Sequence, residues 1–408
     1  MIKSLKCPNI YLVFCLLFAS ISCSEYKSEQ SQSVNYEELN VIKIDKVSKK
    51  MISIDSLIVP GSINFIPLET TTNSSFGSVS KIFLTDSSYV IFDAQLESVY
   101  QFNKKGGYIR KIGEEGKGAL EYTMIKTLSL NKSEGTLDIL DVSKRLIKYD
   151  VSTGKALHER KLDFDNFTVD EYFAIDNNKF IVYNNFRLDM SKPQDTLYRL
   201  RYLNNDITIY QGLPYEFNLE KKIHPHRTRH SIYSYQGNTH FFEPFNSLVY
   251  LLNEDGIEVK YEIKYELTEE ISTQEKVKNL LNGSQDLNRQ YLGKVMETEK
   301  FLFLEFSEAL KGQSVRFRRY ALYDKENEKC LGNSIYSYFI VELGLEVFLH
   351  QLSDQLFVAA VPADVIVKYQ TAYNDALSED EISPLIQEVI NLKIDVADNP
   401  VLILMKLN

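Results

Sequence analysis

The sequence predicts an all-β fold built from a repeat of about fifty residues. Two stretches show the repeat most clearly, "VIFDAQLESVYQFNKKGG" (90–107) and "LDILDVSKRLIKYDVSTGK" (137–155). Each contains a short strand, a turn with an aspartate, a second strand of alternating polarity and a glycine turn. Tyr (26 residues) and Phe (23 residues) are abundant while Trp is absent, which favours half-buried strands.

The same unit recurs at residues 195–206, 246–256 and 318–329. The centres of its alternating strands follow one another at intervals of about fifty residues: Tyr100, Lys148, Tyr198 and Tyr250. Several short strands in a unit of this length are typical of a β-propeller blade. The chain outside two helical segments has room for six blades, or for seven if a helical segment belongs to a blade.

Two segments interrupt the strand pattern with helical spacing. In the first, near 268–300, four apolar side chains fall on one helical face: Leu287, Tyr291, Leu292 and Val295. In the second, near 364–391, Ile366, Tyr369 and Tyr373 share a face. Ser383 and Pro384 then read as the cap and first residue of another helix. We therefore expect a propeller with two helical insertions.

The glycine-rich segment "GGYIRKIGEEGKGALEY" (106–122) could be a phosphate-binding loop or a turn. A Walker-type loop requires Gly-Lys followed by Ser or Thr at the start of a helix, whereas Lys117 is followed by Gly118. No strand–helix–strand pattern surrounds the glycines, so the dinucleotide fingerprint fails as well. The segment lies where one repeat ends and the next begins. It is predicted to be a turn between blades.

The N-terminus has the pattern of a secretory signal in residues 1–22: a basic start, an apolar run over residues 10–19 and small residues before Cys23. The apolar run is too short to span a bilayer comfortably. A cysteine at this point resembles the lipobox of bacterial lipoproteins, although Ser20 replaces the usual Leu. The alternative is an ordinary secretory signal with an incidental cysteine. We expect lipidation of Cys23, a flexible tether over 23–45 and a propeller domain over 46–408.

Charge and cysteine content restrict the partners. The formal net charge is −10, and it becomes −12 once cleavage of the signal removes Lys3 and Lys6. An acidic chain is not expected to bind nucleic acid, so the lipid would supply the membrane attachment. Only Cys23 and Cys330 would remain after cleavage, which leaves no disulfide framework within the chain.

Three motifs resemble those of the six-bladed β-propeller lipoproteins common in Bacteroides-type bacteria: "FIPLET" (65–70), "IGEEGKGALEY" (112–122) and "NPVLILMKL" (399–407). In that family the glycine segment usually runs Ile-Gly-x-x-Gly-x-Gly-Pro-Gly-Glu-Tyr, and here Ala119 and Leu120 replace the Pro-Gly pair. The resemblance covers the chain from about residue 60 to its end. It implies an outer-membrane lipoprotein of a Gram-negative cell envelope, and it implies no particular activity.

One segment, 221–242, gathers most of the side chains that could bind a ligand: His224, His226, Arg227, Arg229, His230 and His240. The arginines could clamp a carboxylate or an acidic sugar, and the histidines could bind zinc or copper. A solvated loop before a strand is the simpler interpretation, and no HExxH-like spacing supports a metal site. No metal, cofactor or catalytic residue is predicted. Asp93 and Asp141, at equivalent repeat positions, are expected to cap turns.

These observations predict a lipid-anchored envelope propeller that acts as a binding or interaction module for glycans, peptides or an envelope protein. The alternative is a propeller enzyme, a lyase or lactonase, that acts on an acidic sugar in the central pocket. An enzyme should gather charged side chains and a metal at the channel. In either case we expect residues 62–69 and 400–407 to share the terminal blade, because propellers commonly close their ring with both chain ends.

Overall fold

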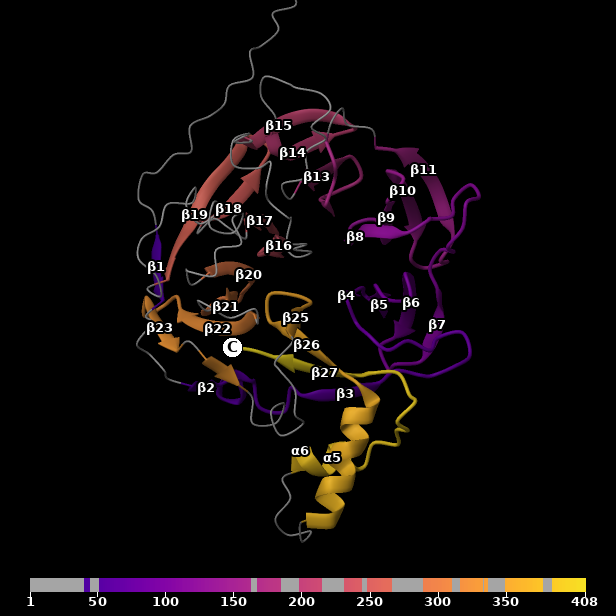
Figure 1. Ribbon diagram of the computed structural model, residues 1–408, viewed down its shortest axis with the longest axis vertical. Coiled ribbons are helices and arrows are strands. Elements are labelled where there is room, and N and C mark those ends of the chain that lie inside the picture. The colour runs from indigo at the N-terminus through magenta and orange to yellow at the C-terminus, as the bar shows by residue number, and fades with distance from the viewer. Residues whose placement is uncertain are drawn as a thin grey trace, which may run out of the picture. The chain divides into compact units, whose positions relative to one another are not determined.

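The computed structural model describes residues 40–44, 51–162, 167–184, 198–214, 231–243, 248–265, 289–309, 316–332, 334–336, 349–376 and 384–408. The chain divides into two units, Met1–Ser33 and Val34–Asn408, and all of the described residues belong to the second. Six sheets of at least four strands follow one another around a centre in this unit (Figure 1). The fold is therefore a six-bladed β-propeller, as predicted.

The first three blades are continuous in sequence. Blade one consists of β4 (Lys81–Leu84), β5 (Ser88–Asp93), β6 (Ser98–Asn103) and β7 (Tyr108–Lys111). Blade two consists of β8 (Ile125–Asn131), β9 (Thr136–Asp141), β10 (Arg145–Asp150) and β11 (Ala156–Lys161). Blade three consists of β12 (Glu171–Ala174), β13 (Lys179–Tyr183), β14 (Tyr198–Asn204) and β15 (Ile207–Pro214).

Of the other three blades, the fourth and the sixth include a strand from the N-terminal part of the chain. Blade four consists of β16 (Ile232–Tyr235), β17 (Asn238–Phe242), β18 (Leu248–Asn253), β19 (Gly256–Tyr265) and the added strand β1 (Val41–Ile44). Blade five consists of β20 (Arg289–Glu297), β21 (Phe301–Ala309), β22 (Arg316–Asp324) and β23 (Lys329–Gly332). Blade six consists of β25 (Leu349–Gln351), β26 (Leu356–Val361), β27 (Val401–Lys406) and β3 (Asn64–Pro67).

The sequence repeat corresponds to the third strand of successive blades, which are β6, β10, β14, β18 and β22. The aspartates at equivalent repeat positions end the second strands and cap the turns that follow, as predicted. The Asp93 carboxylate accepts a hydrogen bond from the Gln95 amide at 2.7 Å. The Asp141 carboxylate accepts one from the Ser143 amide at 2.9 Å. An aspartate favours such a turn because its side chain accepts from the backbone amide two residues further on.

The ring closes through both chain ends, as predicted. Strand β27 pairs antiparallel with β26 on one side and with β3 on the other, and Ile403 lies opposite Phe65. Asn399, which is almost fully buried, reinforces the closure just before β27. Its amide donates to the carbonyls of Glu69 (2.8 Å) and Ser74 (2.7 Å), and its side-chain oxygen accepts from the Phe76 amide (2.9 Å).

The N-terminal segment of the domain lies against the outer side of blades four and five. Strand β1 pairs in parallel with β19 and buries Ile42 and Ile44 completely. Strand β2 (Met51–Ser53) pairs with β24 (Ser334–Tyr336), and the short 3-10 helix η1 (Ile54–Leu57) follows it. The folded domain thus includes residues 41–44, so the last part of the predicted tether (23–45) belongs to blade four.

One predicted helix is wrong. Residues 289–297, within the segment expected to be helical (268–300), form the strand β20, and residues 266–288 lie outside the described residues. A β-bulge at Gly293 explains the error, because the pairing shifts between Leu292 and Lys294. The extra residue places Leu292 and Val295 in the same core cluster although they are three residues apart. This spacing imitates a helical face.

The second helical segment is confirmed. Helices α5 (Ala363–Ala376) and α6 (Pro384–Ile390) lie between β26 and β27 (Figure 1). Ile366 and Tyr369 are buried, and Tyr373 packs against the same cluster. Pro384 is the first residue of α6, where its missing amide hydrogen would have no helical partner.

The glycine-rich segment contains β7, and its residues 112–122 form a turn between blades one and two, as predicted. Gly113 has a φ of 72°, and a Cβ there would lie 2.8 Å from the Tyr149 ring. The Glu121 carboxylate accepts from the Gly118 amide at 2.8 Å, and a Cβ on Gly116 would collide with it. Leu120, which replaces the glycine of the resembling family, still has a left-handed φ of 63°. The turn therefore keeps the conformation that glycine favours.

Candidate functional site: the central cavity and an adjoining charged cluster

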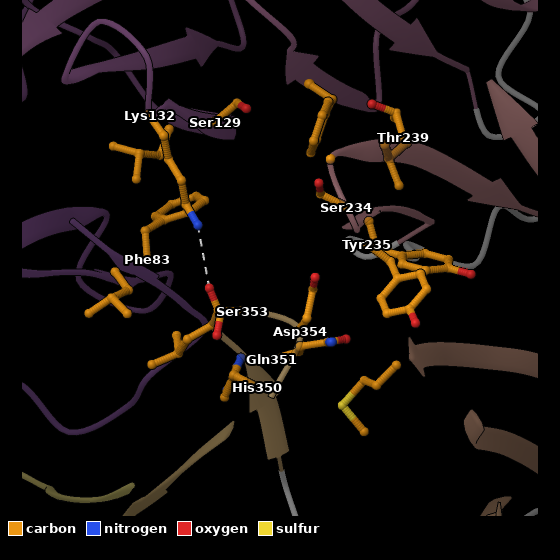
Figure 2. Close-up of a pocket in the computed structure, with 18 of the residues that line it drawn as sticks. Phe83, Ser129, Lys132, Ser234, Tyr235, Thr239, His350, Gln351, Ser353 and Asp354 are labelled. Atoms are coloured by element: carbon orange, nitrogen blue, oxygen red, sulfur yellow. Dashed lines mark hydrogen bonds between the residues drawn. The ribbon is translucent and has the colours of Figure 1, made fainter. Parts of the chain in front are cut away.

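Residues from all six blades line a central cavity of about 890 Å³ (Figure 2). Apart from Thr239 on β17, they come from the innermost strands β4, β8, β12, β16, β20 and β25, or from the turns after them. The first strand of each blade lies nearest the ring centre, so its side chains alternate between the blade packing and the cavity. A volume near the upper end of the usual range of about 300–1,000 Å³ can hold a ligand of several rings.

Three lysines line the cavity: Lys81, Lys132 and Lys294. Each ammonium donates a hydrogen bond to a main-chain carbonyl of another blade, at Leu128 (2.9 Å), Leu352 (3.4 Å) and Leu349 respectively. Figure 2 shows the bond from Lys132 as a dashed line. These contacts link blade one to blade two, blade two to blade six, and blade five to blade six. In each of these bonds a neutral carbonyl accepts one of the three N–H donors of the lysine.

The remaining lining is mixed. Glu299 and Asp354 are its two acids, and Asp354 accepts from the Gln236 amide at 3.2 Å. His350 stands beside Lys294, and burial together with that ammonium lowers the pKa of His350 to about 3, so its ring is neutral. Aromatic and hydroxyl side chains complete the wall, among them Phe83, Phe173, Tyr233, Tyr235, Ser129 and Ser234. Three lysines against two acids leave the lining cationic in an acidic chain.

A charged cluster adjoins the cavity where blades four and five meet. Its centre is Glu297, the last residue of β20, which is fully buried. The Glu297 carboxylate accepts from the ammonium groups of Lys260 (3.1 Å) and Lys325 (3.0 Å). It also accepts from the Tyr261 hydroxyl (2.9 Å) and the Tyr233 hydroxyl (3.3 Å). Burial alone would raise the pKa of Glu297, but the two ammonium groups hold it below its ordinary value.

His240 belongs to this cluster. It lies on β17, is 1% exposed, and its ring stacks on Tyr233 with 5.0 Å between centroids. The Nε2 atom is 2.9 Å from the Lys260 ammonium, which can only donate, so Nε2 is the acceptor and Nδ1 carries the proton. Burial and the Lys260 charge lower the pKa of His240 to about 4. The structure therefore places His240 in a buried network, as a neutral acceptor.

The other predicted site residues lie outside the described residues: His224, His226, Arg227, Arg229 and His230. Cys23 does so too. Within the described residues, no group of three or more His, Cys, Asp or Glu side chains is arranged to hold a metal ion. No helix in the described part of the chain is both long and apolar enough to cross a membrane.

A second buried carboxylate, Glu171, has an unusual protonation equilibrium. It begins β12, and both of its oxygens lie 3.0 Å from the Ser231 amide that donates to them. Burial raises the pKa of Glu171 to about 7 despite this bond. A carboxyl that titrates near neutrality is a candidate acid or base when it faces a ligand. Here its bond to Ser231 links blade three to the start of blade four, which is a structural role.

The buried neutral state of His240 predicts an acid-sensitive stability. Because the folded pKa of about 4 is below the ordinary 6.5, the unfolded chain binds the proton more readily. The contribution is complete above pH 6.5 and is lost as the pH falls from 6.5 to 4, by about 3 kcal/mol. Urea unfolding of wild type and His240→Gln should therefore diverge at neutral pH and converge near pH 4. Parallel pH profiles would contradict this assignment.

The comparisons with known proteins identify the family. Residues 39–406 match the family described as "Domain of unknown function (DUF4934)". The chain belongs to this family. The match spans the whole propeller of this DUF4934 protein, from β1 to the closing strand β27. None of the curated proteins compared with it matches its sequence.

Solved structures resemble the DUF4934 chain to different degrees. A "putative exported protein" from Bacteroides fragilis aligns with a TM-score of 0.68 and 18% identity, over 90% of this chain and 100% of that one. U3-55K aligns at a TM-score of 0.41 and 10% identity over 86% of this chain and all of the other. BamB from Moraxella catarrhalis aligns at 0.36 and 10% over 71% of this chain and 72% of the other. Only the first likeness is close enough to support the fold.

Proposed function

We propose that this protein is a lipid-anchored binding module of the cell envelope that holds an acidic glycan in its central cavity. The observation that carries the proposal is the cationic lining of the cavity, by Lys81, Lys132 and Lys294, in a chain of net charge −10. Lysine ammonium groups are mobile point charges that suit carboxylates presented in more than one geometry. Phe83, Phe173 and the tyrosines supply the apolar and aromatic surface that ligand cavities usually provide.

The proposed location in the cell envelope rests on the N-terminal pattern and on the fold. Residues 1–22 read as a secretory signal, and Cys23 stands where the lipobox of bacterial lipoproteins places the acylated thiol. The B. fragilis protein of the same fold is described as a "putative exported protein". An outer-membrane lipoprotein of a Gram-negative envelope is consistent with both, and a glycan ligand would be available there.

Lipidation is tested by metabolic labelling. Cells that express the protein should incorporate labelled palmitate, and Cys23→Ala should abolish the label because that thiol is the acylated group. Cys330→Ala is the matched control, since Cys330 lies half-buried at blade five and should leave labelling unchanged. Labelling that persists in Cys23→Ala would refute the lipid anchor.

Ligand binding is tested by calorimetric titration of the full-length protein in detergent. A trimer of galacturonate should bind, and the neutral galactose trimer should not. Lys132→Gln should weaken binding by about tenfold or more, because one charge-assisted hydrogen bond is lost. Lys105→Gln, on an exposed turn after β6, removes the same charge and should change nothing.

Equal binding of the acidic and neutral trimers, or no binding of either, would refute the proposal. Stronger binding of a glutamate-rich peptide would support the cationic cavity as the binding site, and it would show that the ligand is an acidic peptide rather than a glycan. Analysis of the titrated mixture for shortened sugars separates binding from the enzyme alternative, because a lyase or lactonase would consume its ligand.

A further inference from the structure

One residue of the charged cluster departs from the propeller repeat. In five blades the fourth strand carries a β-bulge at an equivalent place, where one residue is skipped in the pairing with the third strand. In four of them the skipped residue is aliphatic: Ile109, Leu157, Ile209 and Leu331. In blade four it is Lys260. A charged side chain occupies this place in only one of the five described bulges.

The bulge determines where the lysine points. In a regular strand Lys260 and Tyr261 would face opposite sides of the sheet. A bulge places two consecutive residues on the same side of the strand. Both side chains therefore reach the same oxygen of Glu297, Lys260 at 3.1 Å and Tyr261 at 2.9 Å. Lys260 is directed into the junction between blades four and five, where a lysine from the turn after β22, Lys325, is already present.

The junction holds more positive than negative charge. Lys260 and Lys325 both pair with Glu297, and among the described residues neither makes an ion pair with another carboxylate. The remaining partners are neutral: His240 for Lys260, and the Tyr235 hydroxyl for Lys325. Asp354, the acid near this end of the cavity, accepts from the Gln236 amide and contacts neither lysine. One positive charge is left without a counter-charge in the described structure.

This surplus charge is only partly hydrated. The side chains of Lys260 and Lys325 are 24% and 19% exposed, and Glu297 is not exposed at all. The Glu297 carboxylate accepts from both ammonium groups but carries only one negative charge, so it balances only one of the two. Removing an ammonium from water is costly unless an anion faces it. The partial exposure gives such an anion access.

We propose that the junction of Lys260, Lys325 and Tyr235 is a second binding site, specific for a single carboxylate group. The two ammonium groups lie 5.1 and 4.7 Å from the centre of the Tyr235 ring, so they flank one aromatic surface. Tyr235 and Tyr233 also line the central cavity, and both contact the cluster: the Tyr235 hydroxyl accepts from Lys325, and the Tyr233 hydroxyl donates to Glu297. A monoanion balances the surplus of one charge, whereas a phosphate dianion exceeds it. The site does not depend on the ligand of the cavity.

The test measures thermal unfolding at pH 7.5 and constant ionic strength, with acetate as the carboxylate and acetamide as its neutral isostere. Acetate should raise the melting temperature of wild type, and acetamide should not. Lys260→Leu introduces the leucine found at two of the other four bulges and removes the surplus charge. Its response to acetate should disappear, and its melting temperature without acetate should equal or exceed that of wild type. Lys264→Leu, an exposed lysine on the same strand, is the matched control and should respond like wild type.

A purely structural role for Lys260 predicts the opposite result for both the melting temperature and the acetate response. Lys260→Leu would then melt well below wild type and would respond to acetate as wild type does, which would overturn the proposal. Lys260→Met, which keeps the length of the side chain, replaces the leucine variant if that variant fails to fold. Inorganic phosphate at the same ionic strength should produce a smaller shift than acetate. A larger shift would overturn the assignment to a carboxylate.

Discussion

Deletion of residues 400–408 is expected to leave the protein insoluble or to lower its stability across the whole ring. Strand β27 lies between β26 and β3, so its loss leaves two unpaired strand edges in blade six. Val401, Leu402 and Ile403 are completely buried, and fully burying one such side chain contributes about 1.5–3 kcal/mol. These losses are comparable to the whole stability of a typical protein, about 5–15 kcal/mol.

The measurement is the soluble fraction after expression, followed by urea unfolding of whatever is soluble. Removal of Asn408 alone is the control, since that residue is exposed and lies beyond the paired residues of β27. A soluble protein without residues 400–408 and with an unchanged free energy of unfolding would show that the ring does not depend on this closure.

Glu297→Gln is expected to destabilise the protein by about 3–5 kcal/mol, the usual consequence of removing one partner of a buried ion pair. The substitution keeps the shape of the side chain but leaves Lys260 and Lys325 without their shared carboxylate. Glu299→Gln is the matched control, because Glu299 is exposed and lies two residues further along the chain. Urea unfolding at pH 7 measures both variants. Equal stabilities would mean that the cluster contributes little to folding.

The pH dependence of this effect has a defined sign. The pKa of Glu297 is lower in the folded protein than its ordinary value of 4.5. The carboxylate therefore stabilises the fold fully above that ordinary value, and the contribution is lost as the pH falls through the lower folded pKa. The difference between wild type and Glu297→Gln should shrink only in this acidic range.

The repeat could be predicted because its signals are local. Asp93 and Asp141 end the second strands of their blades, and the alternating strands that follow have the same length, so two copies suffice to show the unit. The closing strand could be predicted because a ring must pair its ends. The strand β20 could not, since the bulge at Gly293 gives its apolar residues a helical spacing that only the pairing with β21 explains.

The charged cluster could not be predicted from spacing. Its members come from four different strands and one turn, and Glu297 lies in the segment expected to be helical. The histidine-rich segment made His240 a candidate ligand-binding residue, but in the structure its ring is a hydrogen-bond acceptor within the cluster. A signal was present in the fourth strands, where Lys260 takes the place of Ile109 and Leu157. Lys260 can be matched with Ile109 and Leu157 only when the bulge positions are known, and these are known from the strand pairing rather than from the sequence.

The most direct test of the central claim is a crystal structure of the protein grown with the galacturonate trimer. The account predicts electron density for the sugar inside the cavity, with its carboxylates within hydrogen-bond distance of at least two of the three lysines Lys81, Lys132 and Lys294. Density for the trimer only on the outer surface of the blades, with an empty cavity, would contradict it.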